Sequence, residues 1–515
     1  MPLFFRRHTT RISLIAQIQK LSLIVFILAL AAVSLFHFRF VNGTWAISPD
    51  STDYVEGARS IVKGEGYRDG MGDAITIYPP GASIAYSLAA ALPRSDYLYF
   101  NLSTKLMLLG FLIFTYLFLQ KAQGSIPALV GFLVLSFSMV PLIESTRILS
   151  DIPFALIVAL ILFLFHPERL QHSSIRQVML LGVLISLSYY IRTEGIYVFC
   201  AYFLYILFGF KENKRRILVI LSCIFFCGAF LWWIRNTQYQ HGESYLVLLQ
   251  KNPWIKDSGT ASLADWQARV LRNTNRMAAA VGKVFSNEYG TFWFGVALSG
   301  LAAVGLLQRD KYSLFCFAFL MAYIPLHLTP RNFQDRYLIS LLPILILLSL
   351  KGFRGFTQMF KKALPQVLVS LALVVVLIGS PYWGRGYRLA KNINDRSKRA
   401  VDPPILFTAN PDYQQLILAY NSRLMNSDVV GCFHTNVVRY LTPQRVRLTS
   451  FLLSENVDKS YLELRNKSVN YLYVDLKSYE TPYMLRVLIK YGSQFVAVAS
   501  NKEAVIYKTR FDAMP

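Results

Sequence analysis

The sequence predicts a polytopic α-helical membrane protein, with about eleven transmembrane helices and a small α/β domain at its C-terminus. Hydrophobic residues make up 54% of its 515 residues and charged residues only 16%, a composition too apolar for an ordinary soluble enzyme. The apolar residues fall in separate runs, many of them close to the roughly 20 residues that cross a bilayer core. After Pro381 the pattern changes to short strand-like runs that alternate with helical ones.

The first apolar run, Leu21 to Phe38, predicts an uncleaved transmembrane helix. It follows a basic start, lacks the small-residue cleavage pattern of a signal peptide and is followed by more runs. The other runs lie at 97–119, 126–143, 152–166, 178–191, 195–210, 217–234, 291–307, 313–328, 337–350 and 363–380. We therefore expect a transmembrane domain over 1–381 and a small domain over 382–515.

The positions of lysine and arginine predict the orientation. The net charge of +24 is concentrated in alternate short connections, such as that with Lys211, Lys214, Arg215 and Arg216. It does not form a basic groove with interleaved aromatics, so we expect membrane lipids as partners and no nucleic acid. We expect a bacterial inner-membrane protein with a cytoplasmic N-terminus and a periplasmic C-terminal domain.

Two further segments, about 39–96 and about 235–290, then face the periplasm. Ser48 and Pro49 are typical of a helix start, and the amphipathic run to Lys63 predicts a helix on the membrane surface. A second such helix is expected from Leu263 to Val284. In the C-terminal domain, strands are expected at 405–408, 446–451, 471–476, 495–499 and 504–508, and helices at 411–420, 455–466 and 480–491.

Carboxylates at the outer membrane edge are candidate site residues, because ionisable groups at that depth are costly and usually functional or paired. Asp50 and Asp53 lie on one face of the first surface helix, as a general base or as ligands of a divalent cation. They could equally complement the helix dipole. Asp151 begins a span, where an N-cap explains it as well as a function does.

Arginines occupy the later outer turns. Arg331 and Arg336 precede the tenth span together with Tyr337, and a guanidinium suits a phosphate because its planar fork donates paired hydrogen bonds. The alternative is interfacial anchoring. Arg192 is followed by Glu194, which could simply neutralise it, and Arg235 follows two tryptophans, where anchoring in an aromatic belt is favoured.

These stretches resemble, in order, motifs of the GT-C superfamily of integral-membrane glycosyltransferases. The likeness is to bacterial relatives of the protein O-mannosyltransferases and of the lipid A aminoarabinose transferases. It lies in Pro49–Tyr54, Gly64–Tyr67, Tyr78–Gly81, Ser150–Pro153, Arg192–Gly195, Trp233–Asn236 and Asp335–Leu338. Tyr78 departs from the lysine of the lipid A enzymes, and the Asp50/Asp53 spacing departs from the adjacent Asp-Glu of the mannosyltransferases.

The resemblance implies transfer of a sugar from a polyprenyl-phosphate donor to a lipid, glycan or protein acceptor, with inversion. Asp50 would be the general base, Asp151 would orient the acceptor or assist a divalent cation, and Arg336 would steady the departing phosphate. The further candidates for substrate or phosphate binding are Asp53, Tyr54, Tyr78, Arg192, Glu194, Arg235, Arg331 and Tyr337.

Two other classes stay open on the sequence. A flippase or transporter of lipid-linked sugars would also need outer arginines, but it is expected to show paired repeats and broken helices, which the sequence lacks. A non-catalytic partner in an envelope complex would not require Asp50.

Overall fold

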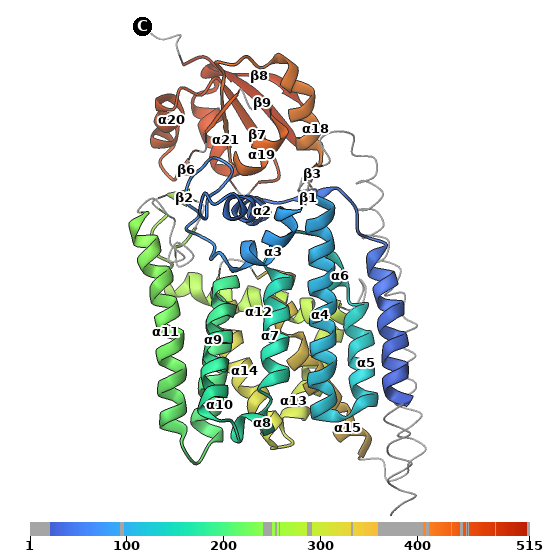
Figure 1. Ribbon diagram of the computed structural model, residues 1–515. Helices are drawn as coiled ribbons and strands as arrows, with labels where there is room; N and C mark the ends of the chain where they lie inside the picture. Colours follow the sequence, from blue (N-terminus) through green and yellow to red (C-terminus); the bar gives the residue numbers. More distant parts are fainter. Residues whose placement is uncertain are drawn as a thin grey trace, which may run out of the picture.

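The computed structural model shows a bundle of upright helices with a mixed α/β domain stacked on one end (Figure 1). It describes residues 21–92, 97–239, 250–252, 255–256, 258–285, 291–330, 333–358, 405–407, 411–433, 435–442, 446–449, 451, 453–478 and 480–511. The apolar run at 363–380 and Arg331 lie outside the described residues.

Each of the other ten apolar runs forms helix. The first helix is Leu21–Phe38. The others are α4 Tyr97–Gln123, α5 Ser125–Ser136, α6 Met139–Glu144, α7 Asp151–Leu164, α9 Ile175–Ile191, α10 Gly195–Gly209, α11 Lys214–Gln238, α13 Thr291–Leu306, α14 Lys311–Leu328 and α15 Leu342–Gln358, with α15 preceded by the 3-10 helix η2 Asp335–Leu341. The run at 126–143 is divided, because Pro141 in α6 has no N–H to continue the hydrogen bonding from α5.

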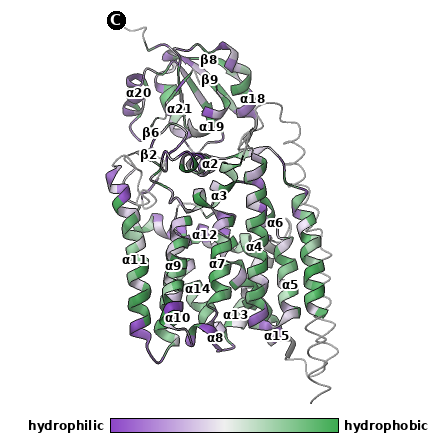
Figure 2. Ribbon diagram, viewed as in Figure 1, coloured by the Kyte–Doolittle hydropathy of each residue, from purple (hydrophilic) through white to green (hydrophobic). Residues whose placement is uncertain are grey.

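The helices have the length and surface of an integral multi-pass membrane protein. Within the described residues, five are long and apolar enough to cross a membrane, accompanied by shorter apolar helices. The first helix and α11 are largely exposed on the outside of the bundle, as lipid-facing helices would be. Hydrophobic residues cover the length of the bundle and hydrophilic ones gather at its ends (Figure 2).

Two short helices lie between the bundle and the C-terminal domain. Helix α2, Pro49–Val62, begins with the expected Ser48 cap, which forms a capping box with Ser51. The chain leaves it through Gly64, whose φ of +77° suits glycine. Helix α3, Gly81–Ala91, was not predicted; its residues were expected within the segment 39–96, ahead of the next span. A Cβ on Gly81 would lie 2.6 Å from the Tyr190 carbonyl oxygen, so α3 packs closely on the end of α9.

The second expected surface helix also forms. It is α12, Leu263–Phe285, which crosses the bundle beneath α2 (Figure 1) and packs against α13. The short helix α8, Pro167–Gln171, joins α7 to α9 at the opposite end.

The C-terminal domain contains a five-stranded mixed sheet in the order β5-β4-β7-β9-β8. Its strands are β4 Val429–Cys432, β5 Arg447–Thr449, β7 Tyr471–Asp475, β8 Phe495–Ser500 and β9 Ala504–Thr509; its helices are α18 Pro411–Tyr420, α19 Thr435–Leu441, α20 Val457–Asn466 and α21 Thr481–Lys490. Strand β4 is parallel to both neighbours, whereas β9 is antiparallel to both of its own. Elements β4 and α19 were not predicted.

Strands from the outer loops tie the C-terminal domain to the membrane domain. Strand β1, Trp45–Ile47, runs parallel to β3, Ile405–Phe407, which was expected within the domain's own sheet. Strand β2, Ile255–Lys256, runs parallel to β6, Leu453–Ser454. The Tyr440 hydroxyl on α19 also donates a hydrogen bond to the Glu56 carboxylate on α2. These contacts fix α2 between the two domains.

Candidate functional site

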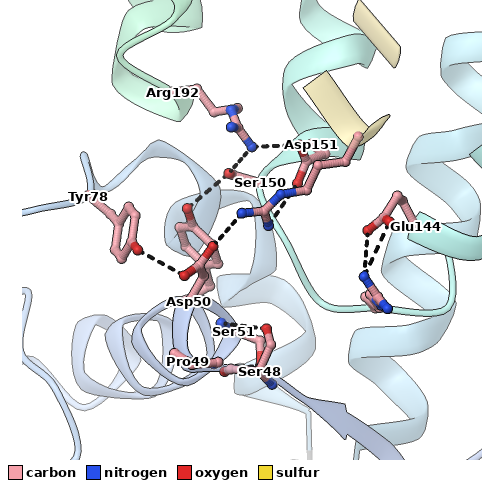
Figure 3. Close-up of polar contacts among 12 residues, drawn as sticks. Ser48, Pro49, Asp50, Ser51, Tyr78, Glu144, Ser150, Asp151 and Arg192 are labelled. Atoms are coloured by element: carbon pink, nitrogen blue, oxygen red, sulfur yellow. Dashed lines mark hydrogen bonds and ion pairs between the residues drawn. The ribbon is translucent and has the colours of Figure 1, made fainter. Parts of the chain in front are cut away.

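Asp50 is positioned by the start of α2. The Ser48 cap fixes this turn, and the Asp50 carboxylate points back toward the bundle, where it meets Tyr78 (Figure 3). The Tyr78 hydroxyl donates to Oδ1 at 2.9 Å and the Arg336 Nη2 group donates to Oδ2 at 2.8 Å. Residues 286 positions apart thus form one charge-assisted contact at the end of the bundle that carries the C-terminal domain.

A second carboxylate, Asp151, lies at the start of α7. It is 3% exposed, so its charge requires partners. Arg192 donates from Nη1 to Asp151 Oδ1 at 2.7 Å and to Ser150 Oγ at 3.1 Å. The Tyr54 hydroxyl reaches the same Ser150 Oγ at 2.9 Å. Arg192 also binds both Glu194 oxygens, through Nε at 3.2 Å and Nη2 at 2.7 Å. Its three nitrogens are therefore all engaged.

Arg336 links the two carboxylates. Besides its contact with Asp50, its Nη1 lies 3.6 Å from Asp151 Oδ2. Its Nε and that same Asp151 oxygen are buried and make no hydrogen bond within the described part of the chain. The ring of Tyr337 lies 5.7 Å from the Arg336 guanidinium and 5.5 Å from that of Arg192. Arg336 therefore has hydrogen-bonding capacity left, unlike Arg192.

The surroundings separate the pKa values of the two aspartates on α2. Burial alone would raise the pKa of Asp50, but the charge and hydrogen bond of Arg336 and the hydrogen bond of Tyr78 hold it below its ordinary value. Burial raises the pKa of Asp53 to about 8, and the charge of Asp50 adds to this. At neutral pH Asp50 is thus the ionised member of the pair.

Glu194 is ionised as well. Burial opposes its charge, but the paired hydrogen bonds and charge of Arg192 outweigh burial and lower the pKa of Glu194 to about 2.

The cluster borders a pocket with about 210 Å³ of empty space that is partly open to solvent. Eight residues line it: Asp151, Phe154, Arg192, Glu194, His327, Arg336, Tyr337 and Ser340. Two carboxylates and two guanidinium groups thus share a cavity with aromatic and hydroxyl groups, which is a suitable lining for a small polar ligand.

The fold has clear structural relatives. No family model matches the sequence, and no curated protein matches it significantly. Among solved structures, ArnT from Cupriavidus metallidurans in the apo state aligns over 95% of this chain and 99% of its own, with 13% identity and a TM-score of 0.55. The same enzyme bound to undecaprenyl phosphate aligns with a TM-score of 0.53 and 14% identity, over 94% of this chain and 97% of its own.

The oligosaccharyltransferase AglB from Archaeoglobus fulgidus, in complex with an inhibitory peptide and a dolichol-phosphate, aligns over 95% of this chain and 74% of its own. The identity is 11% and the TM-score 0.52. Both relatives are GT-C membrane glycosyltransferases. This chain has the GT-C fold.

Within the GT-C fold, most of the expected site residues come together. Asp50, Tyr54, Tyr78, Asp151, Arg192, Glu194, Arg336 and Tyr337 form the contacts described above. Asp53 lies one turn along α2 from Asp50, and Thr52 Oγ1 lies 3.5 Å from its Oδ1. What these residues bind stays a prediction.

Arg235 is engaged elsewhere. It donates to the carbonyl oxygens of Ile75 at 2.8 Å and Tyr67 at 3.2 Å, and it stacks near the Trp232 ring. It therefore holds the loop between α2 and α3 and makes no contact with the Asp50 cluster in the described structure.

The two candidate metal ligands face a guanidinium. Arg336 lies between Asp50 and Asp151 and supplies positive charge to both. Within the described residues, no three His, Cys, Asp or Glu side chains are grouped as metal ligands. This arrangement does not fit a divalent cation held between the two carboxylates, and no step of the proposed reaction uses one.

Two residues of the site were missed by sequence reasoning. His327 on α14 lines the pocket, and a histidine in an apolar span was a signal that could have drawn attention to it. Asn273 on α12 is fully buried and donates to the carbonyl oxygens of Leu328 at 2.9 Å and Pro330 at 2.7 Å, while its Oδ1 accepts from the Phe333 N–H at 3.2 Å. It holds the turn that leads into Arg336.

Proposed function

We propose that this protein is a glycosyltransferase that moves a sugar from a polyprenyl-phosphate carrier to an envelope acceptor, with inversion at the anomeric carbon. The acceptor is a lipid, glycan or protein at the periplasmic face of a bacterial inner membrane. The observation that carries the proposal is the contact of Asp50 with Arg336, which lines a polar pocket, in a fold whose solved relatives bind undecaprenyl phosphate or dolichol-phosphate.

Asp50 acts as the general base. It takes the proton from the acceptor hydroxyl as that oxygen attacks the anomeric carbon, and the bond from that carbon to the phosphate oxygen breaks. The electron pair leaves with the carrier phosphate, and the proton remains on Asp50. Arg336 stabilises the charge that grows on the departing phosphate.

Arg336 couples the action of the base to the binding of the phosphate, because Asp50 and the phosphate both interact with its guanidinium group. In the structure, Arg336 lowers the pKa of Asp50, which makes Asp50 a weaker base. A donor phosphate competes with Asp50 for the same guanidinium. When Arg336 turns toward the phosphate, Asp50 loses its counter-ion and its pKa rises, so donor binding strengthens the base that the reaction needs.

The move of Arg336 from Asp50 to the donor phosphate is supported by three neighbouring residues, Asp151, Arg192 and Glu194. Asp151 lies within 3.6 Å of Arg336 and keeps a carboxylate beside the guanidinium when Asp50 is released. Arg192 is already held by Asp151, Ser150 and Glu194, so it fixes the pocket wall. We therefore assign the donor phosphate to Arg336 and not to Arg192.

The membrane arrangement supports a periplasmic site. The C-terminal domain lies over α2, on the same end of the bundle as Asp50, whereas the basic α10–α11 connection lies at the opposite end (Figure 1). We propose a transmembrane domain over 1–381, a cytoplasmic N-terminus and a periplasmic domain over 382–515.

The test is mass spectrometry of envelope glycans and glycolipids from a strain that lacks this protein. We expect one sugar modification to disappear and to return with the wild-type gene but not with Asp50→Asn. Asp73→Asn, which changes an exposed aspartate of the same outer segment, serves as the matched control and should restore it. Restoration by Asp50→Asn at equal protein level would exclude Asp50 as the base.

A further inference from the structure

The connection between α10 and α11 has a cluster of positive charge that the protein leaves unmatched. Its cations are Lys211, Lys214, Arg215 and Arg216. Across the residues that the structure describes, none of these four side chains donates a hydrogen bond to the protein or forms an ion pair with it. At the same end of the bundle, by contrast, Lys351 binds Asp310 and Lys311 binds Gln171. A negative charge from outside the chain would therefore be attracted to the α10–α11 connection.

The local structure adds to the cost of this charge. Asn213 takes a left-handed conformation, with a φ of +54°, and α11 begins at the next residue. Three of the four cations thus lie in the first turn of α11, where the helix dipole disfavours positive charge, and no acidic residue lies in that turn.

An exposed apolar face begins directly beside these cations. Val219, Phe226 and Phe230 of α11 are exposed. Their spacing places them on the same face of the helix as Arg215 and Arg216. Helix α11 lies on the outside of the bundle and is hydrophobic over most of its length, with hydrophilic residues at the connection to α10 (Figure 2). An acyl chain can therefore lie along this face with its headgroup at the two arginines.

The length of the apolar face corresponds to one bilayer core. Trp233, which is also exposed, lies about 17 residues after Arg216, or roughly 26 Å at 1.5 Å per residue. The hydrocarbon core of a bilayer is about 30 Å thick. Arg216 therefore reaches the phosphate layer of one membrane surface when Trp233 lies at the other interface, where tryptophan is common.

Helix α9 extends the same surface. It packs along α11, where Ser186 Oγ donates to the Ile224 carbonyl oxygen at 3.3 Å. This register brings Arg176, near the start of α9, to the level of the first turns of α11. Leu180 and Val183 are exposed on the same face of α9 as Arg176. A second arginine-ended apolar row thus lies beside the first.

We propose that the α10–α11 connection binds the headgroup of an acidic phospholipid, with an acyl chain against the exposed face of α11. The guanidinium groups of Arg215 and Arg216 suit the lipid phosphate, because each can donate paired hydrogen bonds to it. The excess of positive charge favours an acidic lipid over a zwitterionic one. This interaction is separate from the proposed glycosyl transfer, which takes place at the opposite end of the bundle.

The experiment measures lipid binding to the purified, detergent-solubilised protein by native mass spectrometry. The probes are phosphatidylglycerol and phosphatidylethanolamine with identical acyl chains. We expect the wild type to retain phosphatidylglycerol in preference to phosphatidylethanolamine. Arg215→Gln combined with Arg216→Gln should reduce this preference by about fivefold for each cation removed, as is typical of basic residues beside an anionic membrane surface.

The matched control is Arg465→Gln combined with Lys502→Gln, which removes the same charge from exposed positions of the C-terminal domain and should leave the preference unchanged. Lys211→Gln combined with Lys214→Gln should also reduce the preference, and it replaces the arginine pair if that pair impairs membrane insertion. Equal binding of the two lipids by the wild type, a preference that survives both pairs of substitutions, or an equal loss in the control would overturn the assignment.

Discussion

Replacing Arg336 by alanine removes the cation that Asp50 and Asp151 share. The Arg336 side chain is 15% exposed, and those of Asp50 and Asp151 are 26% and 2% exposed, so these contacts are partly screened from water. The substitution therefore affects two functions at once. It removes a donor aimed at the departing phosphate, and it removes the charge that keeps Asp50 ionised.

The size of the loss follows from the geometry. One preplaced donor to a charge that develops in the transition state contributes about 10²–10³ in rate, or roughly 2.7–4 kcal/mol. We expect kcat to fall by this amount in Arg336→Ala. Arg336→Lys keeps the charge but loses the planar guanidinium that reaches both carboxylates. Its activity should therefore lie between that of the wild type and that of Arg336→Ala. Tyr78→Phe removes one hydrogen bond at 2.9 Å to the ionised Asp50, which corresponds to about 1.5–3 kcal/mol, or roughly tenfold to a hundredfold.

The pH profile gives a second, independent result. Because Arg336 lowers the pKa of Asp50, the ionised base persists to low pH in the wild type. Without Arg336 the pKa of Asp50 rises, so the acid limb of kcat/KM, which reports the free enzyme, should move to higher pH. Tyr78→Phe should move it in the same direction by less.

The assay measures initial rates with an undecaprenyl-phosphate sugar donor from about pH 3 to pH 9, a range that extends below the ordinary pKa of an aspartate. Arg235→Ala is the control, because it removes an outer arginine that holds backbone carbonyls away from Asp50, and its acid limb should match the wild type. If Arg336→Ala keeps the wild-type acid limb, the coupling between Arg336 and Asp50 is refuted.

Three further predictions concern the surroundings of the site. Asn273→Ala removes three hydrogen bonds, to Leu328, Pro330 and Phe333, so kcat should fall more than substrate affinity, and Asn273→Asp, which keeps only the acceptor, should not restore it. Asp53 has a raised pKa and favours folding while protonated, so the gain in Tm from Asp53→Asn should grow between about pH 5 and pH 8; a constant gain would contradict burial as the cause. Tyr440→Phe removes the hydroxyl bound to Glu56, at a cost of about 1.5–3 kcal/mol for a bond to a charged group, and should increase hydrogen exchange in α2; unchanged exchange would argue against this contact as a clamp.

Features set by local sequence were predictable. The apolar runs that lie within the described residues formed helices, and Ser48 with Pro49 began α2 where expected, because caps and hydrophobic periodicity act over a few residues. Helix α3 was missed because its 11 residues are too few to cross a bilayer and were expected within the segment 39–96. Strand β4 was missed because Gly431 interrupts a short run, and only pairing with both β5 and β7 specifies it.

The contacts between the residues of the site could not be predicted from local sequence patterns. The sequence placed Asp50 and Arg336 on the same side of the membrane, but their 2.8 Å contact depends on how α7, α12 and η2 pack together. The turn that presents Arg336 is held by Asn273, a residue on a helix that the sequence marked only as amphipathic. A local pattern carries no information about such a contact between distant segments.

The two arginines of the cluster are packed differently. Arg192 satisfies three acceptors, Asp151, Ser150 and Glu194, and releasing it would leave buried carboxylates without partners. Arg336 makes one short contact and one longer contact, and its Nε makes none in the described structure. A ligand phosphate can therefore engage Arg336 at a smaller loss of existing contacts. The arginine with free donors beside the ionised Asp50 is the one whose bonding can change during the proposed catalytic cycle, and this difference supports our proposal that Arg336 binds the phosphate and Arg192 holds the scaffold.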